Sequence, residues 1–347
     1  MKKMLIVDFG QHFKQINHCS FFWEEYDCDV LVKKKDRDKI DEKKFKSVKV
    51  FSGDFFSLWF SFYYMIFSYR YEKIVFLTPP EYGKGRVASI VKKIYYIYMC
   101  CNGCKCISYL KNIDEYKKDR FLRKGVLKSS LLFFETEMQR DFFIKIKNIN
   151  HNINKYKVAY VYYPDYPDYP DYPDYPDYKV FFEKDKKNKI YIGLIGQFDI
   201  SRRSYDLLYD YLELNNNVVF FQIGRVVSDN TIIKEKYNNR IIFFKKDYTS
   251  IEIDYLLGKM DLLLSMNSKE IGYDLGKGTA AFSEALAMRK RLIVPSFLNI
   301  YEEFNFFCDY YHDVTSLSEA IENNRVIDNR LFLSFSARKI KEKVFYE

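Results

Sequence analysis

The chain has 347 residues, of which 48% are apolar and 30% charged. At roughly 100–200 residues per domain this length suggests about two domains, and the apolar fraction is high enough for a buried core, which excludes general disorder. The 56 basic and 47 acidic residues give a net charge of +9, which suits nucleic acid, an anionic membrane surface or an anionic small substrate as partner.

The first half of the chain alternates strand-like and helix-like segments, the pattern of a parallel α/β domain. Its first apolar stretch, Met4–Val7, is too short for the core of a secretion signal, which needs about 7–15 residues. An odd number of cysteines, seven, also favours a reducing, cytosolic setting. We expect strands at Met4–Phe9, Val48–Phe51, Lys73–Leu77, Lys105–Leu110, Ser130–Phe134 and Val158–Tyr162, and helices at about 54–69, 85–101 and 135–146.

One segment of this half raises the question of a membrane. Residues 55–69 contain no charged side chain, but a helix that spans a bilayer needs about 20 apolar residues. A helix buried in the domain and a helix lying in the headgroup region of a membrane both stay open. We expect no transmembrane helix, and peripheral contact with an anionic membrane.

Residues 164–178 repeat the tripeptide Pro-Asp-Tyr five times. Proline at every third position favours polyproline II, which has three residues per turn, so prolines, aspartates and tyrosines form separate stripes. At about 3.1 Å per residue, the segment is a semi-rigid spacer of roughly 45 Å when extended. We interpret it as a linker between two domains, and docking of the tyrosine stripe on a partner stays open.

The second half repeats the architecture of the first. We expect strands at Lys189–Ile195, Asn217–Ile223, Arg240–Phe244, Asp261–Ser265 and Arg291–Val294, and helices at about 203–214, 251–260 and 279–289. The sequence therefore predicts a Rossmann-like domain at residues 1–162, a linker at 163–179, a second Rossmann-like domain at 180–330 and a C-terminal helix at 331–347.

Two loops of the second half are candidates for binding a diphosphate, because ligands of parallel sheets bind beyond the carboxyl ends of the strands. Gly196 follows the first strand, and Arg202 and Arg203 come at the expected start of a helix, where guanidinium forks suit phosphate oxygens. Gly224 ends the next strand in the same way, and we expect it to face the base or to have a structural role. An exposed helix start with solvated arginines is the alternative interpretation.

The loop before the helix at 279–289 is the most informative. Glycines at 276 and 278 permit close approach of the backbone, and Thr279 can cap a helix whose first turn begins at the small residue Ala280. A helix start offers N–H groups and a positive dipole end to a phosphate. Glu284, one turn further on, can accept hydrogen bonds from a ribose diol. With Lys277 and Gly278 these residues predict a site for a nucleoside diphosphate, although a glycine loop before an ordinary helix has the same pattern.

Two familiar nucleotide motifs are excluded. Gly278 separates Lys277 from Thr279, so the spacing of a P-loop fails. No Gly-x-Gly-x-x-Gly follows the first strand, which argues against a dinucleotide-dependent dehydrogenase. The positive charge is scattered and no stacking motif accompanies it, so we expect no nucleic-acid partner.

Glu284-Ala285-Leu286-Ala287, followed by the strand Arg291–Val294 and Pro295, resembles the GT-B-fold glycosyltransferases, particularly the retaining group called family four. The resemblance covers the layout of most of the chain, but the motif only in its second half. It implies two Rossmann-like α/β domains whose parallel sheets face each other across a cleft, with a nucleotide-sugar donor in the second domain. By that resemblance Glu284 binds the donor ribose, and Arg202 takes the place of the lysine that holds the diphosphate. Gln197 stands where the family often has arginine.

The chain departs from the family at one position. Gly276 stands eight residues before Glu284, where the family carries glutamate. Glu270 and Asp274 are therefore our candidates for the contact with the donor sugar, and retention or inversion of the sugar stays open. In the first domain, His12 and Glu81 are the candidate bases for an acceptor hydroxyl, with a structural or substrate-positioning role as the alternative.

We expect no metal ion and no cofactor. Four close cysteines, Cys100, Cys101, Cys104 and Cys106, lie across one helix–turn–strand junction, whereas structural zinc usually joins two separated pairs. Asp-x-Asp occurs only in the first half of the chain, away from the proposed diphosphate site. The helix dipole and arginines can instead neutralise the leaving group.

Together these features suggest a cytosolic glycosyltransferase that transfers a sugar from a nucleotide diphosphate donor to a glycan or lipid-linked acceptor. From the resemblance and from a composition typical of an AT-rich gene, we expect it at the inner face of the plasma membrane in bacterial surface polysaccharide assembly, such as lipopolysaccharide O-antigen or capsule. A sugar-nucleotide epimerase on the same fold is the first alternative. A non-catalytic nucleotide-sugar-binding protein, suggested by Gly276, is the second.

Overall fold

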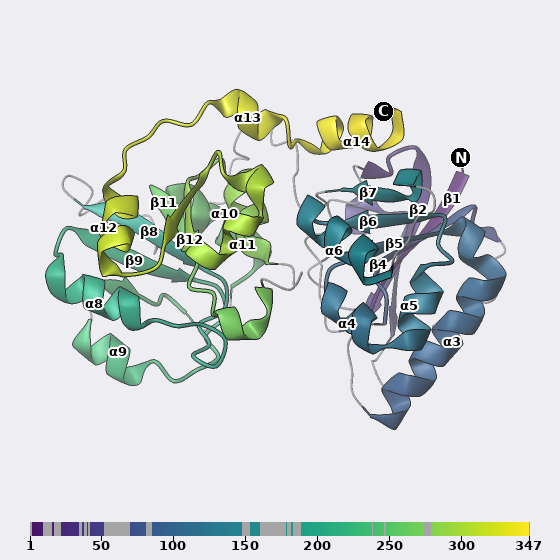
Figure 1. Ribbon diagram of the computed structural model, residues 1–347, viewed down its shortest axis with the longest axis horizontal. Helices are drawn as coiled ribbons and strands as arrows, with labels where there is room; N and C mark the ends of the chain where they lie inside the picture. Colours follow the sequence, from purple (N-terminus) through teal and green to yellow (C-terminus); the bar gives the residue numbers. More distant parts are fainter. Residues whose placement is uncertain are drawn as a thin grey trace. The chain divides into compact units, whose positions relative to one another are not determined.

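The computed structural model in Figure 1 shows a chain of two compact units. It describes residues 2–9, 16, 22–34, 37, 40, 42–51, 70–80, 85–147, 153–159, 178, 182, 189–237, 239–245, 248–273 and 279–346. Of these, the residues up to 159 together with 336–346 form unit 1, and residues 178–335 form unit 2. The helix expected at 54–69 and the first fourteen residues of the Pro-Asp-Tyr repeat lie outside the described residues.

Unit 1 is built on a parallel sheet of seven strands in the order β3-β2-β1-β4-β5-β6-β7. The strands are β1 (Lys2–Asp8), β2 (Tyr26–Lys33), β3 (Ser47–Phe51), β4 (Lys73–Thr78), β5 (Cys106–Leu110), β6 (Leu131–Phe134) and β7 (Tyr156–Val158). The inner strands β1, β4 and β5 are almost continuously apolar and buried, as in parallel sheets whose two faces are both covered. The sequence predicted all of these strands except β2, and β7 begins two residues before its expected start.

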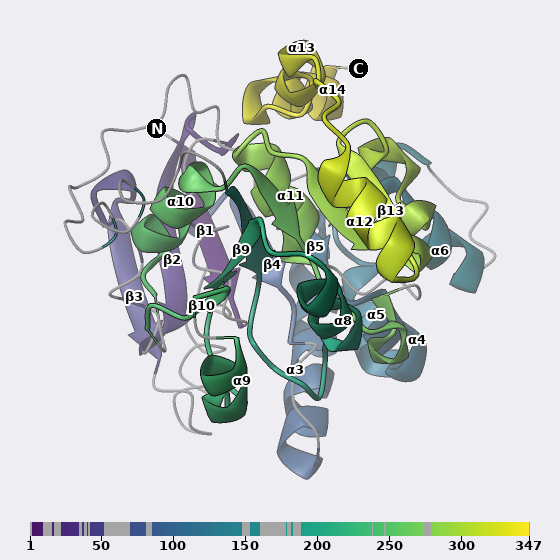
Figure 2. The ribbon, with the colours of Figure 1, turned by 90° about the vertical axis from the view of Figure 1, so that its left-hand side faces the viewer.

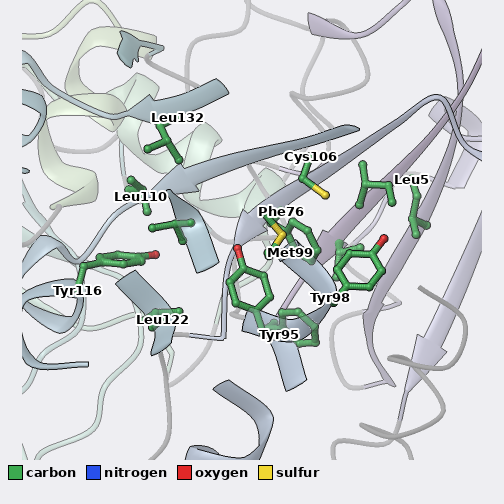
Figure 3. Close-up of a cluster of buried hydrophobic side chains, with 14 of the residues drawn as sticks. Leu5, Phe76, Tyr95, Tyr98, Met99, Cys106, Leu110, Tyr116, Leu122 and Leu132 are labelled. Carbon is green, nitrogen blue, oxygen red and sulfur yellow. The ribbon is translucent and has the colours of Figure 1, made fainter. Parts of the chain in front are cut away.

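The helices of unit 1 are α3 (Arg86–Asn102), α4 (Ile113–Lys118), α5 (Arg120–Val126) and α6 (Glu137–Lys147), with 3₁₀ turns η2 (Glu42–Lys44), η4 (Gly103–Lys105) and η5 (Ile153–Lys155). Helix α3 packs on the sheet and on α5, and Figure 3 shows buried hydrophobic side chains of the core that they share. A Cβ on Gly125 of α5 would lie 2.8 Å from the ring of Tyr95, so only glycine permits this close contact between the helices. We predicted α3 and α6, whereas α4 and α5 are too short to show a helical period.

The C-terminal helix α14 (Ala337–Tyr346) also belongs to unit 1. The ring of Phe345 lies 5.4 Å from that of Trp23 and 5.6 Å from that of Phe22. The Lys341 ammonium lies 3.1 Å from carboxylates of both Glu24 and Glu25. The end of the chain is thus held on unit 1 by an aromatic contact and an ion pair.

Unit 2 contains a second parallel sheet, in the order β10-β9-β8-β11-β12-β13. Its strands are β8 (Ile190–Ile195), β9 (Val218–Ile223), β10 (Ile241–Ile242), β11 (Leu262–Leu264), β12 (Leu292–Pro295) and β13 (Cys308–Tyr311). Its helices are α8 (Asp206–Leu214), α9 (Thr231–Lys236), α10 (Ser250–Lys259), α11 (Ala280–Ala287), α12 (Val314–Glu322) and α13 (Asn329–Leu333), with 3₁₀ turns η6 (Lys269–Ile271), η8 (Ser296–Ile300) and η9 (Glu302–Phe304). Figure 2 shows α8, α9, α10, α11 and α12 around the sheet. Both sheets have the strand order of a Rossmann-type fold.

The last tyrosine of the repeat, Tyr178, is anchored in unit 2. It is buried, its hydroxyl donates to the Glu252 carboxylate at 3.3 Å, and its ring lies 4.8 Å from that of Phe244. Four residues later, Phe182 packs 5.2 Å from the ring of Phe221. The spacer predicted from the sequence therefore ends on these two aromatic anchors.

Candidate functional site

The candidate site lies where the strand order of unit 2 reverses, between β8 and β11, because loops diverge at such a point and leave room for a ligand. The loops that follow these two strands are joined to each other. Arg203 forms an isolated antiparallel bridge with Asn267, Ser204 N donates to Met266 O at 3.3 Å, and Ser268 N donates to Arg202 O at 3.3 Å. Both predicted arginines are thus held by backbone pairing beside the loop after β11.

This pairing corrects our expected helix start. We predicted a helix from Arg203 with Arg202 and Arg203 at its first turn, but α8 begins only at Asp206. The reason is tertiary: residues 202–204 run alongside residues 266–268 and use their backbone groups there. Asp206 then occupies the first turn of α8, where the helix dipole favours a negative charge. Arg202 and Arg203 are loop residues.

Arg202 brings two loops together through its side chain. Its guanidinium donates to the Gln197 amide oxygen at 3.4 Å and to the Tyr273 hydroxyl at 3.2 Å. The backbone oxygen of Tyr273 accepts from the Tyr301 hydroxyl at 2.8 Å, and the Tyr301 ring lies 5.0 Å from that of Phe282 in α11. A chain of contacts therefore connects Arg202 with the first turn of α11, so two of the predicted elements of the site belong to one packed structure.

Glycines allow the backbone of these loops to approach closely. Gly196 has φ +93° and Gly224 has φ +138°, a region that favours glycine. A Cβ on Gly196 would lie 2.2 Å from a guanidinium nitrogen of Arg203, and one on Gly224 would lie 2.4 Å from the backbone oxygen of Gly196. The same oxygen accepts a hydrogen bond from the Gln222 amide at 2.5 Å. The ends of β8 and β9 are thus in direct backbone contact.

The start of α11 matches the expected phosphate-binding element in part. Thr279 is the N-cap residue, and its hydroxyl accepts from Ala281 N at 3.4 Å, while Ala280 is exposed. The Ser283 hydroxyl is turned inward and donates to Ala280 O at 3.2 Å. Glu284, one turn along the helix, is half-buried. The small first turn therefore leaves Ala280 exposed to solvent. Glu284 follows one turn further along the helix.

Of the remaining predicted residues, the structure describes the placement of Glu270 alone. Glu270 lies exposed on η6, which Gly272 closes with φ +80°. His12, Glu81, Asp274, Lys277 and Gly278 lie outside the described residues.

Two buried amides at the carboxyl ends of β9 and β11 were missed by our sequence reasoning. Gln222 Oε1 and Asn267 Nδ2 have no hydrogen-bond partner within the part of the chain that the structure describes. The Ser265 hydroxyl bonds to Asn267, and the Tyr311 hydroxyl donates to the backbone oxygen of Ser265 at 3.2 Å. Burial raises the pKa of Tyr311, which keeps this phenol protonated as a donor. A polar residue near the end of an apolar strand, such as Gln222 one residue before the end of β9, was the available signal.

The described residues were also considered as ligands of a metal ion. Among the residues with described placement, no cluster of three or more histidine, cysteine or carboxylate side chains could hold a metal ion. Of the four close cysteines, Cys106 is buried and donates to Asn102 O at 3.2 Å, while the other three are exposed. Burial raises the pKa of Cys106 to about 12, so it is held as a thiol rather than a thiolate ligand.

No helix among the described residues has both the length and the apolar character needed to cross a bilayer. The uncharged segment 55–69, which raised that question in the sequence, is outside these residues.

Comparison with known proteins gives matches in structure but not in sequence. No family model and no curated protein sequence matches the chain. The Anabaena protein HepE, solved in complex with UDP and glucose, is similar over 99% of this chain and 96% of its own, with a TM-score of 0.62 and 13% identity. Arabidopsis thaliana UGT89C1 is similar over 99% of both chains, with a TM-score of 0.60 and 12% identity.

A UDP-N-acetylglucosamine 2-epimerase is similar over 99% of this chain and 91% of its own, with a TM-score of 0.55 and 10% identity. Glycosyltransferases of GT-B fold and an epimerase thus share this architecture. These similarities are similarities of fold. They do not show that the chain belongs to family four. The chain has the α/β GT-B fold, which confirms the fold class predicted from the sequence.

Proposed function

We propose that the protein is a glycosyltransferase that transfers a sugar from a nucleotide diphosphate donor to a glycan or lipid-linked acceptor. The observation that supports this most is the contact chain from Arg202 through Tyr273 and Tyr301 to α11, at the strand reversal of a GT-B unit. The fold is shared with HepE, which was solved with UDP and glucose.

In this proposal the diphosphate lies between the guanidinium of Arg202 and the first turn of α11. Ala280 is exposed there, so its turn is accessible to a phosphate, and the positive end of the helix dipole favours the charge. Glu284 accepts hydrogen bonds from the ribose diol. Backbone at Gly196 and Gly224 lies close to the nucleotide, and Gln197, Arg203, Lys277, Gly278 and Thr279 complete the donor site.

The proposed reaction displaces the nucleoside diphosphate from the sugar. An acceptor oxygen forms a bond to the anomeric carbon, and the bond from that carbon to the terminal phosphate oxygen breaks. The electron pair stays on the diphosphate, where Arg202 and the start of α11 stabilise the charge. The acceptor proton passes to a base, for which His12 and Glu81 of the first domain are the candidates, or to the leaving diphosphate. Glu270 and Asp274 are the candidates for the sugar contact.

The setting that we propose is cytosolic, at the inner face of the plasma membrane, in the assembly of a bacterial surface polysaccharide such as O-antigen or capsule. The excess of 56 basic over 47 acidic residues and the family resemblance support this setting. The Pro-Asp-Tyr segment is proposed as the linker between the acceptor and donor domains, and its anchoring at Tyr178 and Phe182 is consistent with that role.

An epimerase is the second candidate, because a UDP-N-acetylglucosamine 2-epimerase has the same fold. Incubation with a panel of sugar nucleotides, first alone and then with membrane glycolipid acceptors, separates the two reactions. A glycosyltransferase yields nucleoside diphosphate together with a sugar attached to the acceptor. Isomerisation of the sugar nucleotide without any acceptor contradicts the proposal in favour of the epimerase, and binding without turnover across the panel indicates a non-catalytic protein.

The role of Glu284 gives a separate prediction. A hydrogen bond to a charged group contributes about 1.5–3 kcal/mol, so the protein is expected to bind UDP at least about tenfold more tightly than its 2′-deoxy analogue. In Glu284→Ala this preference should disappear, because the protein then has no carboxylate that could distinguish the ribose hydroxyl of UDP from the 2′-deoxy analogue. Calorimetric titration of both nucleotides measures the difference.

The matched control for this prediction is Glu319→Ala, which removes an exposed carboxylate from α12 and should keep the preference for the ribose hydroxyl. If Glu284→Ala discriminates between the two nucleotides as the unmodified protein does, the ribose contact is assigned to the wrong residue.

A further inference from the structure

Helix α3 of unit 1 presents apolar side chains to solvent. Val87, Ile90 and Ile97 are 52%, 43% and 62% exposed, and Arg86 at the helix start is exposed as well. The first turns of α3 extend beyond the neighbouring helices α4 and α5 of the same unit (Figure 1, Figure 2). The apolar side chains of these turns are therefore accessible from solvent.

The exposed residues form one stripe. Val87, Ile90, Ile94 and Ile97 follow one another at intervals of three, four and three residues, which places them on the same face of a helix. The neighbouring face carries the buried residues Val91, Tyr95, Tyr98 and Met99, which belong to the core. Ile94 is partly buried against that core. The apolar surface of α3 thus continues from the buried face onto side chains that are exposed to solvent.

Helix α5 widens this surface. Phe121 is 37% exposed, and its ring lies 5.9 Å from that of Tyr96 in α3. The ammonium group of Lys93 lies 5.5 Å from the centre of the Phe121 ring. The surface formed by Arg86, Val87, Ile90, Lys93, Ile97 and Phe121, here called the α3 surface, therefore combines apolar side chains with cations at their border.

The segment of the chain that carries this surface is rich in basic residues. Residues 86–126 contain ten basic and three acidic residues, and so carry a net +7 of the +9 of the whole chain. Helix α3 itself has no acidic residue. Of the three acidic residues, Asp119 pairs with Lys92 at 3.3 Å and Asp114 pairs with Lys118. Lys92 and Lys111 are buried, whereas Arg86 and Lys93 are exposed at the border of the surface and give it a positive charge.

We propose that the α3 surface docks on an anionic lipid bilayer. Apolar side chains enter the boundary between headgroups and acyl chains, while the surrounding cations interact with lipid phosphates. A second copy of this chain is a poorer occupant, because it would bring the same cations against each other. Nucleic acid would use the cations but leave Val87, Ile90 and Ile97 without a role.

This inference names the surface for the membrane contact included in the proposed function, and in that respect rests on it. The test is therefore made without any sugar nucleotide. The full chain is sedimented with vesicles of phosphatidylcholine alone and of phosphatidylcholine mixed with phosphatidylglycerol. We expect binding to the mixed vesicles only, and weaker binding at high salt, because salt screens the attraction. Failure of vesicle binding with intact glycosyl transfer contradicts this inference alone.

Two sets of substitutions locate the contact. Each basic residue near an anionic surface contributes about 1 kcal/mol, so Arg86→Ala with Lys93→Ala should weaken vesicle binding about 30-fold. Val87→Ser, Ile90→Ser and Ile97→Ser together should weaken it at least as much, because they remove the inserted groups. The control pair Leu214→Ser and Ile232→Ser, at exposed apolar positions of unit 2, should leave it unchanged.

The inference is overturned if the control pair weakens vesicle binding as much as the α3 substitutions do. It is also overturned if the protein does not bind the mixed vesicles but forms a dimer that the three serine substitutions dissociate, as sedimentation velocity would show. Since all of these side chains are exposed, retained thermal stability of the variants distinguishes a lost contact from a lost fold.

Discussion

Arg202→Ala is expected to weaken the binding of UDP about 100-fold. Arg202 is the guanidinium that two loops of the site hold in place, through Gln197 and Tyr273. A charge-assisted contact of this kind contributes up to about 3 kcal/mol when the partner is a phosphate in a partly buried site. Isothermal titration with UDP measures the loss.

Arg202→Lys separates the charge from the shape of the group. Lysine keeps the positive charge but loses the planar fork, so it should restore only part of the affinity. Arg330→Ala, an exposed arginine of α13 paired with Asp328, is the matched control and should bind UDP normally. Unchanged affinity in Arg202→Ala would show that the diphosphate is held elsewhere.

Gly224→Ala is expected to lower the free energy of unfolding by about 3 kcal/mol, since it combines a strained backbone with a steric conflict. Gly224 has φ +138°, and the added Cβ would lie 2.4 Å from the backbone oxygen of Gly196. Neither the glycine nor that backbone oxygen can move without separating the ends of β8 and β9. Chemical denaturation measures the change.

Gly85→Ala is the control for the steric part of this effect. Gly85 also has a positive φ, +91°, but a Cβ there would meet nothing within 4 Å. Gly85→Ala should therefore lower the free energy of unfolding only through backbone strain, by about 1 kcal/mol. Equal losses in the two variants would mean that the contact between the ends of β8 and β9 does not contribute to stability.

The fold could be predicted from the sequence because most strands are short apolar runs that end in glycine or a polar residue. Where that signal is interrupted, prediction failed. In β2, Asp27 and Asp29 break the apolar run, and the structure shows that Asp29 accepts hydrogen bonds from Ser47 and Tyr71. In β13, Asp309 pairs with Arg291 of a distant segment. Local patterns do not reveal such partners.

The site could be predicted only in part, for a similar reason. Local backbone chemistry predicts the two glycines that end strands, Gly196 and Gly224, and the helix cap at Thr279. The structure places the glycines at the ends of β8 and β9 and the cap before α11. The position of Arg202 depends on pairing with a loop more than sixty residues away, which moved the start of α8. Tyr273 became part of the site only through that pairing.

A crystal structure of the protein with UDP tests the proposed donor site most directly. We expect the diphosphate at the first turn of α11, within hydrogen-bond distance of Ala280 N or Ala281 N and of the Arg202 guanidinium. A diphosphate bound away from α11, or a nucleotide whose phosphates do not contact Arg202, would contradict it.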